Sequence, residues 1–172
     1  HAGNQADVLK HICLIQAYKS LKKHHNSISY IDTHSGSGIY KFNSEYMSKN
    51  KEYENGLSKL ENYNDKNISI KYYLKVLRNI NNSKKMSFYP GSPLIMSYMS
   101  DNTDKLSFYE LHNNEFVLLR KNLSKQSNSK VFNKDGFNFT NQKISSNEKT
   151  LVLIDPSYEI KDDFIKVVNT LR

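Results

Sequence analysis

Residues 150–158 are Thr-Leu-Val-Leu-Ile-Asp-Pro-Ser-Tyr, an unbroken apolar run that ends in a polar turn. A short apolar run bounded by turn residues is typical of a β-strand whose two faces are both buried, and such strands occur mainly in parallel sheets. We therefore expect a strand over residues 150–155, within a parallel sheet that is covered on both faces.

Strand and helix patterns alternate along the rest of the chain. Three more strands are predicted by β-prone runs at residues 27–32, 106–111 and 130–136. Helices are predicted by apolar residues at helical spacing over residues 6–23, 72–80, 114–123 and 162–172, with one more helix after Ser92. Strands that alternate with helices indicate an α/β fold built on a parallel sheet.

Residues 40–87 differ in character from the sequence on either side. They are rich in Lys, Asn, Glu and Tyr, they lack proline, and their charged and aromatic residues fall at helical spacing. We interpret this segment as a small inserted helical subdomain. Residues 1–39 and 88–172 would then form the sheet domain.

Each predicted strand ends in an acidic residue or is followed closely by one: Asp32, Glu110, Asp135 and Asp155. Ligands of open α/β sheets bind beyond the carboxyl ends of the strands, so we expect these four carboxylates to converge on one crevice. A glycine turn, residues 33–38, follows Asp32 and would let the backbone approach a ligand closely.

Single residues around this crevice support more than one interpretation. Glu110 is placed to accept hydrogen bonds from ribose hydroxyls, and Asp135, beside Gly136, from the amine of a cofactor's adenine. A solvated strand-end acid and a plain Asp-Gly turn are the alternatives. Lys10 is a candidate partner for the carboxylate of a bound amino-acid moiety, and an ordinary solvated lysine is the alternative.

The turn Asp155-Pro156-Ser157-Tyr158 carries the most specific chemistry. The exocyclic amine of adenine is a poor nucleophile because its lone pair is delocalised into the ring. The Asp155 carboxylate and the Pro156 carbonyl can accept hydrogen bonds from that amine, and the Tyr158 ring can stack on a base that has left its helix. An ordinary Asp-Pro turn after the strand is the alternative.

The composition narrows the class of partner. The net charge is +8, which indicates either a polyanionic partner such as nucleic acid or a compositional bias toward lysine. The single cysteine excludes an internal disulfide, and the histidines show no metal-ligand spacing, so we expect no metal. We find no secretory signal and no run of ~20 apolar residues, and we expect a cytoplasmic protein without a membrane partner.

Taken together, these stretches strongly resemble one family, the bacterial 23S ribosomal RNA adenine-N6 methyltransferases of the RlmJ (YhiR) type. The resemblance runs in order from the first residue nearly to the last. It is carried by His-Ala-Gly-Asn-Gln-Ala-Asp-Val-Leu-Lys-His at residues 1–11, Asp-Thr-His-Ser-Gly-Ser-Gly at 32–38, Tyr-Pro-Gly-Ser-Pro at 89–93, Glu-Leu-His at 110–112, Asp-Gly at 135–136 and Asp-Pro-Ser-Tyr-Glu at 155–159.

The resemblance implies a Rossmann-like fold that binds S-adenosyl-L-methionine, with a helical subdomain inserted after the first strand. It implies methyl transfer to N6 of an adenine in 23S ribosomal RNA, expected to be protein-free. The cofactor pocket implied by position consists of Lys10, His11, His34, Ser92, Glu110, Asp135, Gly136 and Asp155. Asp155 is also the implied catalytic acceptor, with Pro156 and Tyr158 around the target adenine.

Two departures from the family pattern keep alternatives open. Ser157 stands where the family has a second proline, which would loosen the loop that holds Tyr158. The chain also stops one predicted helix after the catalytic strand and lacks residues that precede His1 in the family, so we expect a truncated form with an exposed apolar sheet edge. The alternatives are a non-catalytic RNA- or cofactor-binding remnant and a DNA adenine-N6 methyltransferase. The oligomeric state does not follow from the sequence.

Overall fold

A computed structural model describes residues 2–42, 52–61, 67–83, 86–141 and 148–171 of the chain. The chain divides into two compact units, and each is described here by itself. The first unit contains residues 1–20 and 38–99, and the second contains residues 21–37 and 100–172. His1 of the opening motif, parts of the predicted insertion and Arg172 of the last predicted helix lie outside the described residues.

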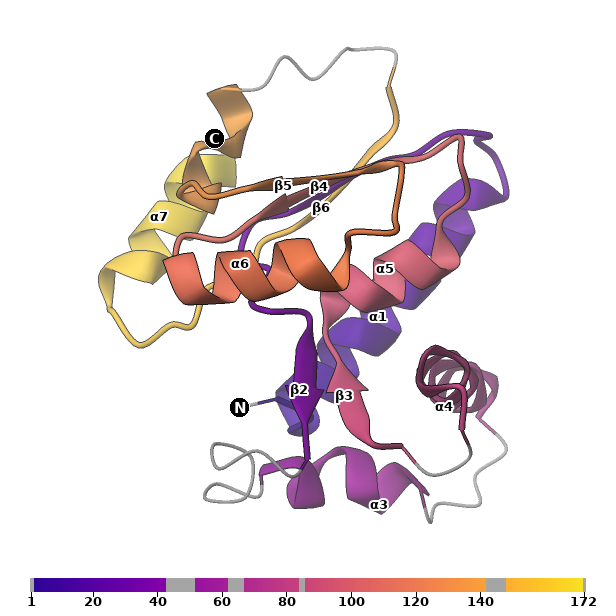
Figure 1. Ribbon diagram of the computed structural model, residues 1–172. Coiled ribbons are helices and arrows are strands. Elements are labelled where there is room, and N and C mark those ends of the chain that lie inside the picture. Colours follow the sequence, from indigo (N-terminus) through magenta and orange to yellow (C-terminus); the bar gives the residue numbers. More distant parts are fainter. Residues whose placement is uncertain (1, 43–51, 62–66, 84–85, 142–147, 172) are drawn as a thin grey trace. The chain divides into compact units, whose positions relative to one another are not determined.

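The second unit is built on a parallel sheet of four strands in the order β5-β4-β1-β6 (Figure 1). The strands are β1 (Ser29–Asp32), β4 (Lys105–Tyr109), β5 (Ser129–Phe132) and β6 (Thr150–Leu153). The helices of this unit are α6 (Asn113–Asn122), α7 (Asp162–Leu171) and the short 3-10 helix η2 (Gly136–Asn141). The predicted α/β fold and all four predicted strands are confirmed.

Alternate residues of the central strands fill the two faces of this sheet, as the pleat of a β-strand requires. On one face Ile31 and Tyr109 pack with Phe139 of η2. On the other face Tyr30 meets Phe108 edge-on, with 6.0 Å between the ring centroids. Helix α6 runs along the sheet and buries its Leu119 (Figure 1).

The expectation that residues 150–155 are covered on both faces is wrong. Strand β6 lies at the edge of the sheet with β1 as its neighbour, and each of its four residues stays partly exposed. Helix α7 of this unit also exposes apolar side chains: Phe164, Ile165, Val168 and Leu171. The apolar run therefore predicted a parallel strand correctly, but this strand pairs on one side only among the described residues.

The first unit is mostly helical. Its helices are α1 (Gln5–Lys22, up to Ser20 in this unit), α3 (Leu57–Glu61), α4 (Ile68–Asn81), α5 (Ser92–Met99) and the 3-10 turn η1 (Glu52–Asn55). Two short strands, β2 (Ile39–Lys41) and β3 (Phe88–Pro90), pair antiparallel. That pair was not predicted. The boundaries proposed for the inserted subdomain, residues 40 and 87, stay a prediction.

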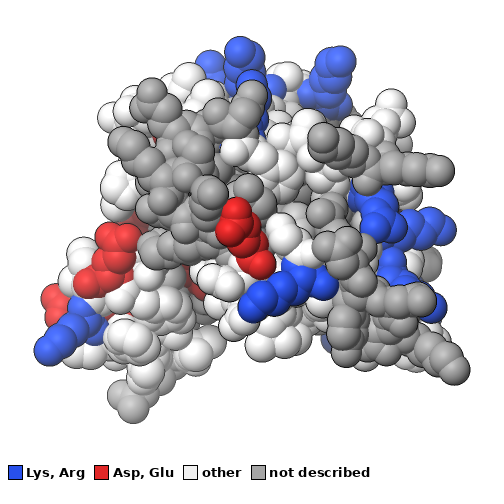
Figure 2. Space-filling model, turned by 90° about the horizontal axis from the view of Figure 1, so that it is seen from below, with Lys and Arg blue, Asp and Glu red and all other residues white. Residues whose placement is uncertain are grey.

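Helix α4 is the best-defined element of the proposed insertion. Asn67 caps its first turn by accepting hydrogen bonds from the backbone N–H groups of Ser69 and Ile70. Asn82 ends the helix in the left-handed conformation at φ 49°. The helix buries one apolar face and leaves its lysines in solvent. Figure 2 shows several Lys and Arg side chains toward the right of the view, the side on which α4 lies in Figure 1.

No helix in the described parts of the chain combines the length and the apolar character that a membrane span requires.

Candidate active site

The carboxyl ends of all four strands lie at one edge of the sheet of the second unit. Strands β1, β4 and β5 follow one another outward, whereas β6 returns to the other side of β1. The order of the strands therefore reverses between β1 and β6, and ligands of such sheets bind at that point. Asp155 and the glycine turn both lie at this reversal, because Asp32 pairs with Leu153.

The glycine turn is held against the end of β4. The backbone N–H of Ser35 donates to the Tyr109 carbonyl at 2.9 Å, and that of Gly36 donates to Glu110 Oε2 at 2.8 Å. Gly36 adopts φ 57°, a left-handed conformation that glycine reaches without strain. The Ser35 hydroxyl donates in turn to the Asp32 carbonyl at 3.2 Å, and Ser35 and Ser37 are both buried, so the turn is fixed in place by its backbone N–H groups and by a side chain.

Glu110 is a buried carboxylate rather than a solvated one, since its residue is only 7% exposed. Its second oxygen, Oε1, accepts from the backbone N–H of His112 at 2.8 Å. Each carboxylate oxygen can accept a second hydrogen bond. Glu110 therefore braces the turn and keeps the capacity to accept from a hydroxyl group of a ligand.

Asp32, the first of the four strand-end acids, points inward. It is fully buried and accepts a hydrogen bond from the Tyr30 hydroxyl at 3.0 Å. This carboxylate is therefore part of the core and does not face the crevice as expected. Of the four acids, Glu110, Asp135 and Asp155 are left as candidates for the crevice.

Thr33 connects β6 to His34. Its hydroxyl donates to the Leu153 carbonyl at 3.1 Å and lies 2.7 Å from His34 Nδ1. Because a hydroxyl has one proton and a carbonyl can only accept, the Nδ1 nitrogen of His34 must donate to Thr33. A neutral His34 in this tautomer carries its lone pair on Nε2, which makes that nitrogen an acceptor.

Several residues of the predicted site interact electrostatically with His34. Burial lowers the pKa of His34, while the nearby carboxylates of Asp135, Asp155 and Asp163 oppose that shift. The imidazole also packs edge-on against Phe137, with 4.7 Å between the ring centroids. Asp135 and Asp155, which follow strands of the same sheet, thus both act electrostatically on His34 at its carboxyl edge.

Asp135 and Gly136 form a tight turn that fits against β1. Asp135 Oδ1 accepts from the backbone N–H of Phe137 at 2.9 Å, which confirms the turn and uses one carboxylate oxygen. A Cβ atom on Gly136 would lie only 1.8 Å from the Thr33 carbonyl oxygen. Only glycine fits here, and the observed close approach is to this backbone.

The turn after β6 places its three functional candidates differently. Asp155 is partly buried, the Pro156 ring is buried, and Tyr158 is 40% exposed. Tyr158 adopts φ 55°, a conformation that is uncommon outside glycine and is often strained at functional sites. Its ring lies 4.8 Å from that of Phe164, centroid to centroid, and burial together with Asp155 and Asp163 raises the pKa of its hydroxyl.

Lys10, His11 and Ser92 belong to the first unit, where local contacts hold the opening motif. Asn4 caps α1 by accepting from the backbone N–H of Asp7, and Asp7 accepts in return from that of Gly3, both at 2.9 Å. Lys10 Nζ lies 2.5 Å from Asp7 Oδ1. Burial opposes ionisation of Asp7, yet the charges of Lys10 and His11 and the hydrogen bonds from Lys10 and from the Gly3 backbone N–H lower its pKa.

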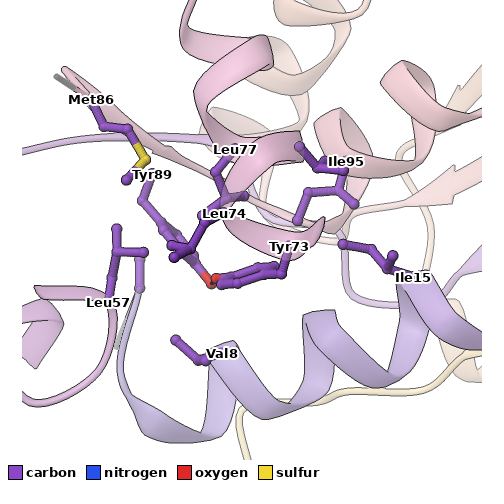
Figure 3. Packing of buried hydrophobic residues seen from close by; sticks show 11 residues of the cluster. Val8, Ile15, Leu57, Tyr73, Leu74, Leu77, Met86, Tyr89 and Ile95 are labelled. Atoms are coloured by element: carbon purple, nitrogen blue, oxygen red, sulfur yellow. Dashed lines mark hydrogen bonds between the residues drawn. The ribbon is translucent and has the colours of Figure 1, made fainter. Parts of the chain in front are cut away.

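His11 lies in the core of the first unit and is 1% exposed. Its Nδ1 is 2.8 Å from the Tyr89 hydroxyl, which is 3.1 Å from that of Tyr73, and Figure 3 shows these two phenols meeting. Burial, reinforced by Lys10, lowers the pKa of His11 to about 3. Ser92 is buried as the first residue of α5, one residue earlier than the expected helix start.

The sequence analysis did not predict three contacts at the site. Thr33 bridges β6 and His34, Phe137 packs on the imidazole, and Asp163 of α7 is buried near His34 and Tyr158. For Asp163, the sequence offers one signal, the pair of acidic residues Asp162 and Asp163 at the start of the last predicted helix. No group of three potential metal ligands occurs within the residues that the structure describes.

Comparison with known proteins identifies a family and several relatives. The sequence model of one family, described as "Ribosomal RNA large subunit methyltransferase D, RlmJ", matches residues 25–172. The chain is 37% identical to "Ribosomal RNA large subunit methyltransferase J" of Escherichia coli (strain K12), over 98% of this chain and 61% of that protein. It is 38% identical to the protein of the same name from Haemophilus influenzae, over 100% of this chain and 62% of that protein.

A solved structure agrees with the sequence matches. The crystal structure of protein LPL1258 from Legionella pneumophila superposes with a TM-score of 0.88 at 32% identity, over 99% of this chain and 63% of that one. The chain therefore spans about three fifths of the length of these relatives. Since the family model covers most of the chain, the chain belongs to the RlmJ family of ribosomal RNA large subunit methyltransferases.

Proposed function

We propose that this chain carries the cofactor-binding and catalytic part of an S-adenosyl-L-methionine-dependent methyltransferase that modifies N6 of an adenine in 23S ribosomal RNA. The observation that supports this most is the electrostatic interaction of Asp135 and Asp155 with His34 where the strand order reverses, directly before Pro156 and Tyr158. Membership of the RlmJ family supports it independently.

The residues at the sheet edge fit the methyl donor chemically. Glu110 has acceptor capacity for ribose hydroxyls, and Asp135 uses one carboxylate oxygen in its own turn and has the other for an adenine amine. The glycine turn, with Gly36 at φ 57°, offers a bare backbone surface beside them. Lys10, His11 and Ser92 remain proposed pocket residues, although Lys10 contacts Asp7 and His11 is buried.

The chemistry proposed for the turn after β6 is orientation of the target amine. S-Adenosyl-L-methionine supplies an electrophilic methyl group when bound. The Asp155 carboxylate and the Pro156 carbonyl accept the two N–H bonds of the adenine amine, which turns its lone pair toward the donor. Tyr158 holds the flipped base by stacking, for which its ring must be partly exposed, as it is.

The proposed substrate is protein-free 23S ribosomal RNA, and the proposed location is the cytoplasm. The net charge of +8 favours a polyanion but does not distinguish RNA from DNA. The relatives whose names specify ribosomal RNA support RNA. Duplex DNA is therefore the control substrate.

The proposal is tested by two measurements on this chain. Calorimetry with S-adenosyl-L-methionine measures cofactor affinity, and an Asp135→Asn variant serves as the comparison because it keeps the volume of the side chain. Transfer of a radioactive methyl group to protein-free 23S RNA and to duplex DNA measures the reaction.

We expect cofactor binding that Asp135→Asn weakens by about tenfold, the worth of one good charged hydrogen bond. We also expect methyl transfer to RNA. Absence of cofactor binding would contradict the proposal, and so would transfer to DNA alone. Cofactor binding without any transfer would assign the chain to the non-catalytic alternative.

A further inference from the structure

The solvent face of α4 carries a stripe of positive charge. Lys71, Lys75 and Arg78 are spaced four and three residues apart, so they share one side of the helix and span about 10 Å along its axis. The opposite side buries Tyr73 and Leu77 in the core of the first unit, as Figure 3 shows. Packing therefore fixes which way the three cations point.

These cations line a groove of about 1000 Å³. The remaining lining residues come from the end of α4 and from α5: Asn79, Asn82, Ser83 and Tyr98. Asn79 Nδ2 donates to the Tyr98 hydroxyl at 2.8 Å, and the Tyr98 residue is still 48% exposed. The groove thus combines fixed positive charge with an oriented aromatic ring.

No acidic residue pairs with the cations of this groove among the residues that the structure describes. The sequence contains six Lys and Arg residues and no Asp or Glu between residues 66 and 100. Within the described residues, the ion pairs of the molecule involve Lys10, Lys22 and Lys105, none of which lines the groove. Arg78 Nε is buried and has no hydrogen-bond partner there. In Figure 2 the visible Asp and Glu side chains lie at the left and centre, away from the right-hand side.

We propose that this groove binds the backbone of the RNA substrate, with phosphates along Lys71, Lys75 and Arg78 and an unpaired base on Tyr98. Three cations spread over about 10 Å suit a chain of phosphates better than one small anion. An exposed aromatic ring beside them suits a single-stranded nucleic acid, because every base can stack on it. The inference rests on the proposed function, since it names how that same substrate is held.

The test compares two triple variants with equal charge changes. The groove variant is Lys71→Gln, Lys75→Gln and Arg78→Gln. The matched control is Arg120→Gln, Lys121→Gln and Lys125→Gln, which removes one Arg and two Lys from exposed positions in and after α6. Fluorescence anisotropy measures the affinity of each protein for a labelled single-stranded RNA of about 20 nucleotides at several salt concentrations. Circular dichroism and the melting temperature verify folding.

We expect the groove variant to bind RNA roughly 10- to 100-fold more weakly, and its slope of log K against log salt to fall by about 2. The control should lose less than about threefold. Equal losses in both variants would mean that only net charge matters, and they would overturn the inference. So would an unchanged RNA affinity of the groove variant.

The Tyr98 contact is tested separately. Tyr98→Phe keeps the ring and loses only the hydroxyl, whereas Tyr98→Ala removes the stacking surface. We expect the first to retain RNA affinity within about twofold and the second to lose about tenfold. Equal affinities for the two variants would overturn the stacking role.

Failure of this inference and failure of the proposed function give different results. A groove variant that still binds RNA and still transfers methyl groups would disprove the groove and leave the function standing. A wild-type chain that binds RNA through the groove but transfers no methyl group would disprove the function and leave the groove standing.

Discussion

The two compact units hold their buried polar side chains in different ways. In the first unit, polar groups of the opening motif contact one another or the core: Asn4 pairs with Asp7, Asp7 with Lys10, and His11 Nδ1 with the Tyr89 hydroxyl, while His11 Nε2 is buried without a hydrogen-bond partner among the described residues. In the second unit, His34, Asp135 and Asp155 gather at the edge of a parallel sheet and stay partly exposed. Matching a family motif therefore does not imply one role, because several residues of the opening motif have a visible structural purpose.

The largest effect on stability is expected at one glycine in each unit, where a Cβ atom would collide with the backbone. A Cβ on Gly136 would lie 1.8 Å from the Thr33 oxygen, and one on Gly56 would lie 2.2 Å from the Gly3 oxygen. We predict that Gly136→Ala and Gly56→Ala each lower the free energy of unfolding by about 3 kcal/mol, because backbone atoms cannot yield. Urea denaturation measures this. Gly91→Ala is the control, since its Cβ would meet the Tyr40 side chain at 3.2 Å; a similar loss there would contradict the explanation.

A second difference between the units concerns pH. The pKa of His11 is about 3 when folded and about 6.5 when unfolded, because burial and the nearby Lys10 charge outweigh Asp7. Below pH 6.5 the unfolded chain therefore binds a proton that the folded chain does not. The contribution of His11 to the free energy of unfolding is therefore fully present above pH 6.5 and is lost as the pH drops toward 3. The free energy of unfolding should fall by about 2 kcal/mol between pH 6.5 and 5.

His11→Phe separates this effect from that of other groups. The variant lacks the titrating imidazole, so its free energy of unfolding should depend less steeply on pH over the same range. His34, whose pKa is also lowered, contributes equally to both proteins. Parallel pH profiles for the variant and the wild-type chain would show that His11 is not the buried group responsible.

The smallest effect is expected at the start of α1. Asn4→Ala removes the acceptor for the Asp7 backbone N–H and should cost about 1 kcal/mol. Asn4→Ser keeps a capping oxygen and should cost only a fraction of that. Thermal unfolding of the two variants measures the difference, and identical melting temperatures would indicate that the cap contributes nothing.

The sequence predicted the sheet of the second unit well, because each strand is a short β-prone run that ends in an acidic residue or is followed closely by one. It did not predict the pairing of β2 with β3, since strands of three residues show no periodicity. It could not show that Asp32 points into the core, because a pleated strand end can present its side chain to either face.

The candidate site was predicted in part. Asp135 and Asp155 both act electrostatically on His34 at the sheet edge, since parallel strands end together, while the roles of Asp135, Gly136 and Asp155 in binding and catalysis stay predictions. The bridging role of Thr33 and the packing of Phe137 on His34 arise from contacts distant in sequence, which no local pattern encodes. The Asn4–Asp7 cap, by contrast, follows a known spacing and was open to prediction.

Identification of the methylated nucleoside tests the proposed chemistry most directly. The chain is incubated with S-adenosyl-L-methionine and protein-free 23S RNA, and the RNA is digested to nucleosides for mass spectrometry, with Asp155→Ala as the comparison. We predict N6-methyladenosine as the product and a yield at least about 100-fold lower for the variant, with cofactor affinity changed far less. Methylation of another atom, or an undiminished yield with Asp155→Ala, would contradict the assignment of Asp155 and of this turn as the catalytic centre.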